Sequence, residues 1–165
     1  MDIIIRSMRI EDHNQIRDLD ILTQKQYLGA KFEQMSKEEK GDHLVSRKSE
    51  FQINIDTGYC FVALNNNTII GFILAHETLP FHGDLYVRYI GVDPKFQDKG
   101  IGQLLYKKLI GKAKQAGINR IKALINIDNP NSIKLHGKMG FELKDRKEAV
   151  LQINKYPHPS PATGS

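Results

Sequence analysis

The chain has 165 residues, of which 40% are hydrophobic and 26% charged, and such values indicate one globular domain with a sizeable core. The formal net charge of +5 suits an anionic ligand or an ordinary surface, and the lysines form no basic block with interleaved aromatic residues, which argues against a nucleic-acid-binding protein. Cys60 is the only cysteine, so an intramolecular disulfide and a metal site of several thiolates are excluded.

The sequence contains no run approaching about 18 apolar residues, which is the length that a membrane span needs, and no basic leader before an apolar stretch. We therefore expect a cytoplasmic protein without membrane contacts. Cys60 lies in an apolar segment, where we expect a small buried strand residue.

Hydrophobic periodicity and turn residues predict one domain, residues 1–156, built from strands and helices. The expected strands cover residues 2–10, 58–66, 68–78, 84–92, 120–127, 141–147 and 149–156. The expected helices cover residues 11–28, 36–51, 101–116 and 129–140. The order β-α-α-β-β-β-α-β-α-β-β indicates an α/β (α+β) fold with about six to seven strands. We expect the Pro- and Ser-rich residues 157–165 to form a flexible tail.

Several boundaries have a local chemical cause. Ser36 is a typical helix N-cap, and the Asn-rich residues 65–67 are typical of a tight hairpin turn. Gly117 follows the apolar stripe of the helix at 101–116 and is well placed to end it.

A glycine-containing turn links the strand predicted over 84–92 to the helix after it. The stretch VDPKFQDKGIG contains Gly100 and Gly102 at this junction. A dinucleotide fingerprint would need a third glycine at Leu105, and a Walker loop would need a Gly-Lys-Ser/Thr sequence, so neither motif is present. A helix N-terminus remains, whose free N–H groups at 98–103 converge on one anion and whose bare glycines let a diphosphate approach. A purely structural turn is the alternative.

Two motifs resemble those of the GNAT superfamily of acyl-CoA-dependent N-acyltransferases. QDKGIG, residues 97–102, matches its (Gln/Arg)-x-x-Gly-x-(Gly/Ala) signature, and the preceding YIGVDP resembles its fourth strand. NPNSIKLHGKMGF, residues 129–141, resembles its second signature, and the order of elements over residues 3–156 is similar. The resemblance implies the GNAT fold, with a mixed central sheet that splays between the fourth and fifth strands. It also implies acetyl-CoA as co-substrate and no metal.

The same resemblance implies which residues hold the coenzyme. The fourth strand would pair with the pantetheine amides, and an N–H at Ile90 or a neighbour would face the thioester oxygen, where a fixed donor stabilises the developing oxyanion. The 98–103 turn would bind the diphosphate, and Asn129, with Ser132 nearby, would hold the pantetheine arm. Asp98 places a carboxylate beside the diphosphate, or serves the helix N-terminus instead. The full set is Ile90, Gly91, Val92, Gln97, Asp98, Lys99, Gly100, Ile101, Gly102, Gln103, Asn129 and Ser132.

Acyl transfer also needs an acid for the departing thiolate and a base for the amine. Relatives commonly use a Tyr of the second signature as the acid, and His136 occupies that position. An imidazolium with a reference pKa of about 6.5 can protonate a thiolate of about 8.5, so His136 is the candidate acid, and a surface histidine without a role is the alternative. Leu124, Arg88 and Tyr89 stand where different relatives carry a carboxylate base. Other candidates, acting through water, are Glu77, Asp84, His76 and His82.

The sequence therefore predicts an N-acetyltransferase that uses acetyl-CoA by direct attack in a ternary complex. Deprotonating a lysine side chain near neutral pH costs roughly 4 kcal/mol and an α-amine only about 0.5 kcal/mol, so we expect a protein N-terminus, an amino acid or a small-molecule amine as acceptor. A non-catalytic CoA-binding module is the alternative. Residues 23–40 and 78–83 would select the acceptor, with Tyr27, Phe32 and Phe81 in a cleft or in the core. Monomer and homodimer both remain open.

Overall fold

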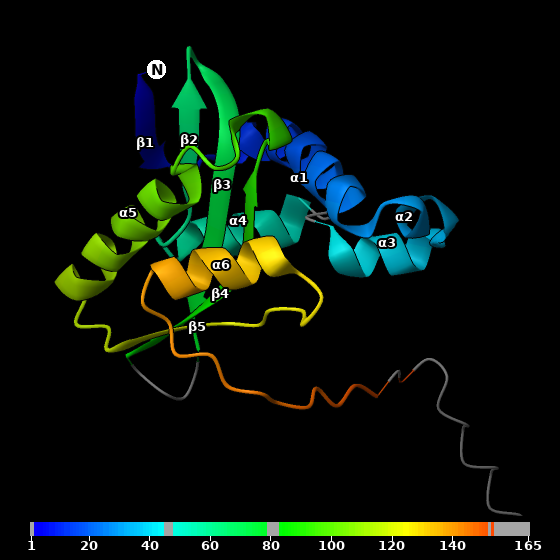
Figure 1. The fold of residues 1–165 in the computed structure, drawn as a ribbon. Coiled ribbons are helices and arrows are strands. Elements are labelled where there is room, and N and C mark those ends of the chain that lie inside the picture. Colours follow the sequence, from blue (N-terminus) through cyan, green and yellow to red (C-terminus); the bar gives the residue numbers. More distant parts are fainter. Residues whose placement is uncertain (1, 45–47, 79–82, 152, 154–165) are drawn as a thin grey trace, which may run out of the picture.

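The computed structural model describes residues 2–44, 48–78, 83–151 and 153, and its centre is a five-stranded sheet (Figure 1). The strands, in spatial order, are β1 Ile3–Ser7, β2 Phe61–Asn65, β3 Thr68–Glu77, β4 Asp84–Val92 and β5 Arg120–Ala123. The helices are α1 His13–Leu28, α2 Ala30–Gln34, α3 Lys37–His43, α4 Lys48–Asp56, α5 Ile101–Gln115 and α6 Pro130–Lys138, with 3-10 helices at Ile10–Asp12 and Pro94–Phe96. The first four strands pair antiparallel and β4 pairs parallel with β5, so the sheet is mixed, as predicted.

Helices cover both faces of the sheet, and β3 is therefore a nearly continuous run of buried apolar residues. On one face, Leu105 of α5 and Ile73 of β3 belong to one core cluster. On the other face, Ile16 of α1 and Phe51 of α4 form a second cluster with Phe72. Figure 1 shows α5 and α4 on opposite sides of the strands.

Three boundaries expected from the sequence are confirmed. Asn66 and Asn67 join β2 to β3 with φ angles of 48° and 65°, which is the backbone of a tight hairpin turn. Gly117 follows α5 with φ at 72°. Ser36 caps α3, and its hydroxyl and the Glu39 carboxylate each accept a hydrogen bond from the other residue's backbone N–H.

The polar segment after α1 forms three helices, whereas the sequence predicted one helix over 36–51. Gly29 turns the chain with φ at 56°, and α2 follows with Phe32 only 3% exposed. Leu44 then leaves α3 with extended backbone, φ −106° and ψ 150°. Residues 45–47, which precede α4, lie outside the described part of the chain. The single-helix prediction is wrong because a stretch with so few apolar residues carries no periodic signal that would reveal a break.

The two closing strands differ most between prediction and structure. Residues 141–151 have no regular secondary structure, so the strand predicted over 141–147 is wrong. The second predicted strand, 149–156, lies partly outside the described residues, and the predicted tail, 157–165, lies wholly outside them. The described sheet therefore has five strands and not the expected six to seven.

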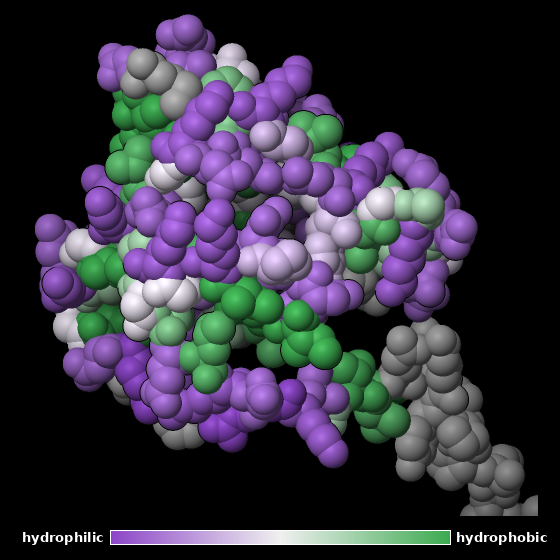
Figure 2. Space-filling view, viewed as in Figure 1, coloured by the Kyte–Doolittle hydropathy of each residue, from purple (hydrophilic) through white to green (hydrophobic). Residues whose placement is uncertain are grey.

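The physical reason for this difference lies in β5. Its ladder with β4 covers only Arg120–Ala123 and stops before the predicted end at residue 127, so little strand is present against which a further strand could pair. Ile127 and Val150 are 92% and 74% exposed. Figure 2 shows hydrophobic surface gathered below the position of α6. The apolar residues that suggested strands are thus largely exposed in this structure.

Candidate functional site

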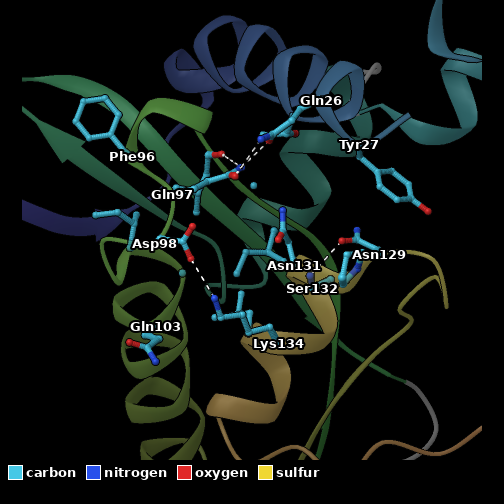
Figure 3. A pocket seen from close by; sticks show the side chains of 18 of the residues that line it. Gln26, Tyr27, Phe96, Gln97, Asp98, Gln103, Asn129, Asn131, Ser132 and Lys134 are labelled. Carbon is cyan, nitrogen blue, oxygen red and sulfur yellow. Dashed lines mark hydrogen bonds and ion pairs between the residues drawn. The ribbon is translucent and has the colours of Figure 1, made fainter. Parts of the chain in front are cut away.

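A cleft of about 440 Å³ opens where β4 and β5 separate. The parallel ladder ends at Val87 and Ala123, whereas β4 continues to Val92. The sheet is therefore splayed between its fourth and fifth strands, as predicted. The end of β4, the turn before α5, the first turn of α5, the start of α6 and the second half of α1 line the cleft (Figure 3).

A β-bulge in β4, which was not predicted from the sequence, lies just before the cleft. Leu74 is opposite Tyr89 and Ala75 is opposite Val87, which leaves Arg88 as the extra residue of β4. A bulge bends its strand and redirects the residues that follow. The residues that follow the bulge, Ile90, Gly91 and Val92, line the cleft.

The first turn of α5 presents backbone donors to the cleft. Gly100 is the N-cap residue with φ at 81°, and no side chain caps it among the described residues. The first bond of the helix runs from the Leu104 N–H to the Gly100 carbonyl, at 3.0 Å. The N–H groups of residues 101–103 therefore lack an intrahelical acceptor. These residues line the cleft, and their donors suit a diphosphate.

The glycines around the cleft are required for different reasons. Gly100 needs its left-handed φ, because a side chain there would be strained. A Cβ on Gly102 would lie 2.9 Å from Cδ2 of Leu135, so this glycine permits the close packing of α6 on α5. A Cβ on Gly91 would lie 2.7 Å from the Phe72 ring. The absent side chain at Gly102 thus serves helix packing, and the predicted approach of a ligand at this glycine, which lines the cleft, stays a prediction.

Gln97 fixes the turn before α5 to α1. Its side-chain amide exchanges two hydrogen bonds with that of Gln26, at 2.7 and 3.1 Å, and also donates to the Val92 carbonyl at 3.1 Å. The dashed lines of Figure 3 show this amide pair at the upper edge of the cleft. The contact joins residues that are 71 positions apart, so the sequence alone could not have found it.

Asn129 caps α6 at the opposite side of the cleft. Its side-chain oxygen accepts a hydrogen bond from the Ser132 N–H at 3.1 Å, and Pro130 occupies the first helical position. Every expected coenzyme-binding residue except Lys99 lines the cleft. The Lys99 ammonium instead donates to the Lys95 carbonyl at 3.0 Å.

His136 lies in the core between α5 and α6. Its side chain is 1% exposed, and it does not line the cleft. Nδ1 lies 2.7 Å from the Ser132 carbonyl, so this nitrogen carries the proton, and Nε2 then accepts from the Tyr106 hydroxyl at 2.6 Å. Burial lowers the pKa of the imidazole. The imidazole is thus neutral, and both of its nitrogens are hydrogen-bonded. Its role as an acid stays a prediction.

A tyrosine and an aspartate form a polar pair at the other end of the cleft from α5. The Tyr27 hydroxyl of α1 donates to the Asp128 carboxylate at 2.5 Å, and both residues line the cleft. Burial, followed by this hydrogen bond, raises the pKa of the Tyr27 phenol. In Figure 3, Tyr27 and Asn129 lie on one side of the cleft and Asp98 on the other.

The remaining candidate bases lie elsewhere. Asp84 is 2% exposed and forms ion pairs with Arg120 and Lys122 at 2.7 and 2.6 Å, so it ties β4 to β5. Glu77 accepts a hydrogen bond from Tyr59 at 2.8 Å. Nδ1 of His76 lies 3.0 Å from the Glu77 carbonyl, and Leu124 is exposed. His82, the last candidate base, and Phe81, an aromatic residue expected in the acceptor cleft or the core, lie outside the described residues.

Cys60 is buried at 3% exposure, as expected. Burial raises the pKa of its thiol to about 11, so the thiol is un-ionised near neutral pH.

Several cleft residues were missed as ligand contacts. They include Thr23, Gln26, Phe96, Asp128, Asn131, Lys134 and Lys138. Helical spacing could have suggested two of these, since Lys134 and Lys138 are four positions apart and share one face of the helix that Asn129 begins. The α1 residues reach the cleft through tertiary packing, which no local pattern encodes.

The chain belongs to the GNAT family of acetyltransferases. Residues 24–141, most of the chain, match the family model described as Acetyltransferase (GNAT) family. The splayed sheet and the cleft at its fourth strand agree with this membership.

Individual relatives are similar over part of their length. The [ribosomal protein bS18]-alanine N-acetyltransferase of Haemophilus influenzae is 32% identical over 98 residues, which is 59% of this chain and 60% of that protein. The L-methionine sulfoximine/L-methionine sulfone acetyltransferase of Pseudomonas aeruginosa is 28% identical over 118 residues, 66% of each. The chain thus spans less than two thirds of the length of either relative.

The fold is also similar to that of a solved structure. PaiA N-acetyltransferase from Thermoplasma acidophilum, in complex with coenzyme A, superposes with a TM-score of 0.75 at 20% identity, over 89% of this chain and 94% of that one.

The described residues also bear on metal binding and on membrane spanning. They contain no group of three or more His, Cys, Asp and Glu side chains that could hold a metal ion. Each helix that the structure describes is too short or too polar to cross a membrane.

Proposed function

We propose that this protein transfers the acetyl group of acetyl-CoA to a primary amine, by direct attack in a ternary complex. The acceptor is a protein N-terminus, an amino acid or a small-molecule amine. Acetyl-CoA supplies an acyl group that is activated as a thioester. The coenzyme assignment rests on family membership and on the residues that line the cleft.

The observation that carries the proposal is the combination of two free backbone surfaces in one cleft. The residues of β4 beyond Val87 have left their ladder with β5, so their peptide groups on that side can pair with the amides of a pantetheine arm. The N–H groups of residues 101–103 can bind a diphosphate. An N–H at Ile90 or a neighbour would stabilise the oxyanion that develops on the thioester oxygen. The Asn129 side chain would position the arm from the opposite wall.

The named activities of the relatives support an amine acceptor. One relative is named for acetylating an alanine of a ribosomal protein and another for acetylating methionine sulfoximine. Leu124, Arg88 and Tyr89 stand at the positions where different relatives carry a carboxylate base, which favours an amine of low pKa. An α-amine near pKa 7.8 is deprotonated at neutral pH at a cost of about 0.5 kcal/mol.

Tyr27 and Asp128 are the groups that could transfer the proton. The Asp128 carboxylate would accept a proton from the attacking amine, directly or through water, and the Tyr27 phenol would donate one to the departing thiolate. Proton movement from Asp128 to Tyr27 along their hydrogen bond then restores both groups. The net change is one proton moved from nitrogen to sulfur.

A non-catalytic CoA-binding module is the second candidate function. The burial of His136 favours it, because the position at which relatives commonly carry their acid faces the core in this chain. Such a module would keep the cleft and its backbone donors without turning over the thioester.

One assay separates the two candidates. Purified protein is incubated with acetyl-CoA and a pool of peptides with free N-termini, amino acids and small amines, and the release of free thiol is followed. We expect release above the rate of spontaneous hydrolysis, and faster release with α-amines than with peptides that offer only a lysine side chain. If the protein binds CoA but releases no thiol from acetyl-CoA with any amine of the pool, the result would favour the module. Much faster acetylation of lysine side chains or polyamines would contradict the low-pKa acceptor.

A further inference from the structure

An ion pair crosses the cleft at the end where α5 begins. Asp98 lies in the turn before α5 and Lys134 lies on α6, and both residues line the cleft. The Lys134 ammonium is 3.5 Å from a carboxylate oxygen of Asp98, and the dashed line in Figure 3 marks this contact.

The geometry of the pair shows that it is easily broken. The side chains of Lys134 and Asp98 are 59% and 86% exposed, and the contact is long for an ion pair. Exposed pairs of this kind contribute about 0–1 kcal/mol. A ligand of higher charge can therefore displace either partner from the ion pair.

The position of the carboxylate makes the pair unusual. Asp98 has a φ of 58° and lies immediately before the uncapped start of α5, yet its side chain does not cap that helix. The carboxylate faces Lys134 and leaves the N–H groups of residues 101–103 open. An anion that binds these groups would lie between two cationic partners, the helix N-terminus and Lys134, and beside one repelling carboxylate.

We propose that Lys134 is the side-chain cation for the coenzyme diphosphate, and that Asp98 is a built-in competitor which holds Lys134 until the coenzyme binds. This inference rests on the proposed function. When a diphosphate occupies the start of α5, Lys134 exchanges the single charge of Asp98 for the larger charge of the ligand. Asp98 then repels the bound diphosphate and speeds its departure, which matters because product release limits the turnover of many enzymes.

The test is calorimetric titration of CoA and of dephospho-CoA into the full chain at low ionic strength. Asp98→Asn should bind both ligands about threefold to tenfold more tightly, and Lys134→Gln should bind both about threefold to tenfold more weakly. Dissociation of CoA from Asp98→Asn, followed by stopped flow, should slow by a similar factor. Circular dichroism confirms that both exposed variants fold.

Matched controls remove the same charges from exposed positions outside the cleft. Asp18→Asn on α1 and Lys108→Gln on α5 should leave both affinities within about twofold of the wild type. Equal effects from the controls would overturn the proposal, because a general change of net charge would then explain the result.

Three other outcomes would also overturn it. Unchanged or weaker binding by Asp98→Asn would mean that Asp98 does not compete. Weakening by Lys134→Gln that affects CoA but not dephospho-CoA would move Lys134 to the 3′-phosphate. A wild type that binds no CoA would refute both this proposal and the proposed function, whereas CoA binding without thiol release would refute acetyl transfer alone.

Discussion

Tyr106 and His136 share a hydrogen bond of 2.6 Å inside the core, where α5 meets α6. The Phe141 ring packs against the imidazole with a centroid distance of 4.9 Å. The Tyr106 hydroxyl and the imidazole therefore bond to each other, and Nδ1 of the imidazole also lies 2.7 Å from the carbonyl and 3.3 Å from the hydroxyl of Ser132. Such a network makes the docking of α6 specific, because removal of one partner leaves the other buried and unpaired.

Replacing His136 by Ala should lower the free energy of unfolding by about 2–4 kcal/mol, since it leaves a cavity and an unpaired Tyr106 hydroxyl. Urea denaturation measures this change, and Tyr106→Phe is a milder companion variant. Unchanged stability together with a large loss of turnover at unchanged CoA affinity would contradict the structural role and support His136 as the acid.

The same histidine predicts how stability depends on pH. Burial lowers the pKa of the folded imidazole below the ordinary 6.5, so the unfolded chain binds this proton first. Stability should therefore fall as the pH drops below about 6.5, by at most about 1.4 kcal/mol per pH unit. Unfolding at pH 7.5 and 5.5 measures the fall, and His136→Gln should show a smaller one. Equal falls in both proteins would contradict the assignment.

Tyr27→Phe keeps the ring and removes the hydroxyl that donates to Asp128. If this pair transfers the proton, kcat should fall about tenfold to a hundredfold, with CoA affinity within about twofold of the wild type. Steady-state kinetics and calorimetry measure the two quantities. A loss confined to KM for the acceptor would instead make Tyr27 a binding residue.

At the scale of elements, the packing of α6 on α5 depends on the missing side chain of Gly102. The shape of the cleft depends on the same packing, because Asn129 at the start of α6 lines the cleft. A side chain at position 102 would therefore push Leu135, and with it α6, away from the first turn of α5.

Replacing Gly102 by Ala should lower the free energy of unfolding by about 1–3 kcal/mol, because its Cβ would meet Leu135 at 2.9 Å. Gly111→Ala in the same helix is the matched control. A Cβ at Gly111 has nothing within 4 Å, so helix propensity should stabilise that variant by about 0.5–1 kcal/mol. Chemical denaturation compares both variants with the wild type. Stabilisation by both substitutions would contradict the packing role of Gly102.

For the molecule as a whole, the resemblance of two motifs to the GNAT superfamily predicted the mixed sheet, its splay and the residues around Gly100 and Asn129, which line the cleft. The two motifs could be recognised in the sequence because each combines a local backbone requirement with a fixed position in the order of elements. Gly100 needs a left-handed backbone, and Asn129 is a helix cap.

Other features could not be read from the sequence, because they depend on contacts between distant segments. The amide pair of Gln26 and Gln97 and the pair of Tyr27 and Asp128 bring α1 to the cleft. The burial of His136 depends on Tyr106, which lies 30 positions earlier in the chain. The closing strands were predicted from alternating residues, but alternation alone does not specify a partner strand, and residues 141–151 form none.

We expect the open start of α5 to bind the diphosphate of a coenzyme, a claim that calorimetric titration of CoA into the purified chain can test. We expect saturable binding with a dissociation constant in the micromolar range, about −7 to −8 kcal/mol, and much weaker binding of pantetheine, which lacks the diphosphate. An absence of heat with CoA at millimolar concentration, or equal affinities for CoA and pantetheine, would contradict the claim.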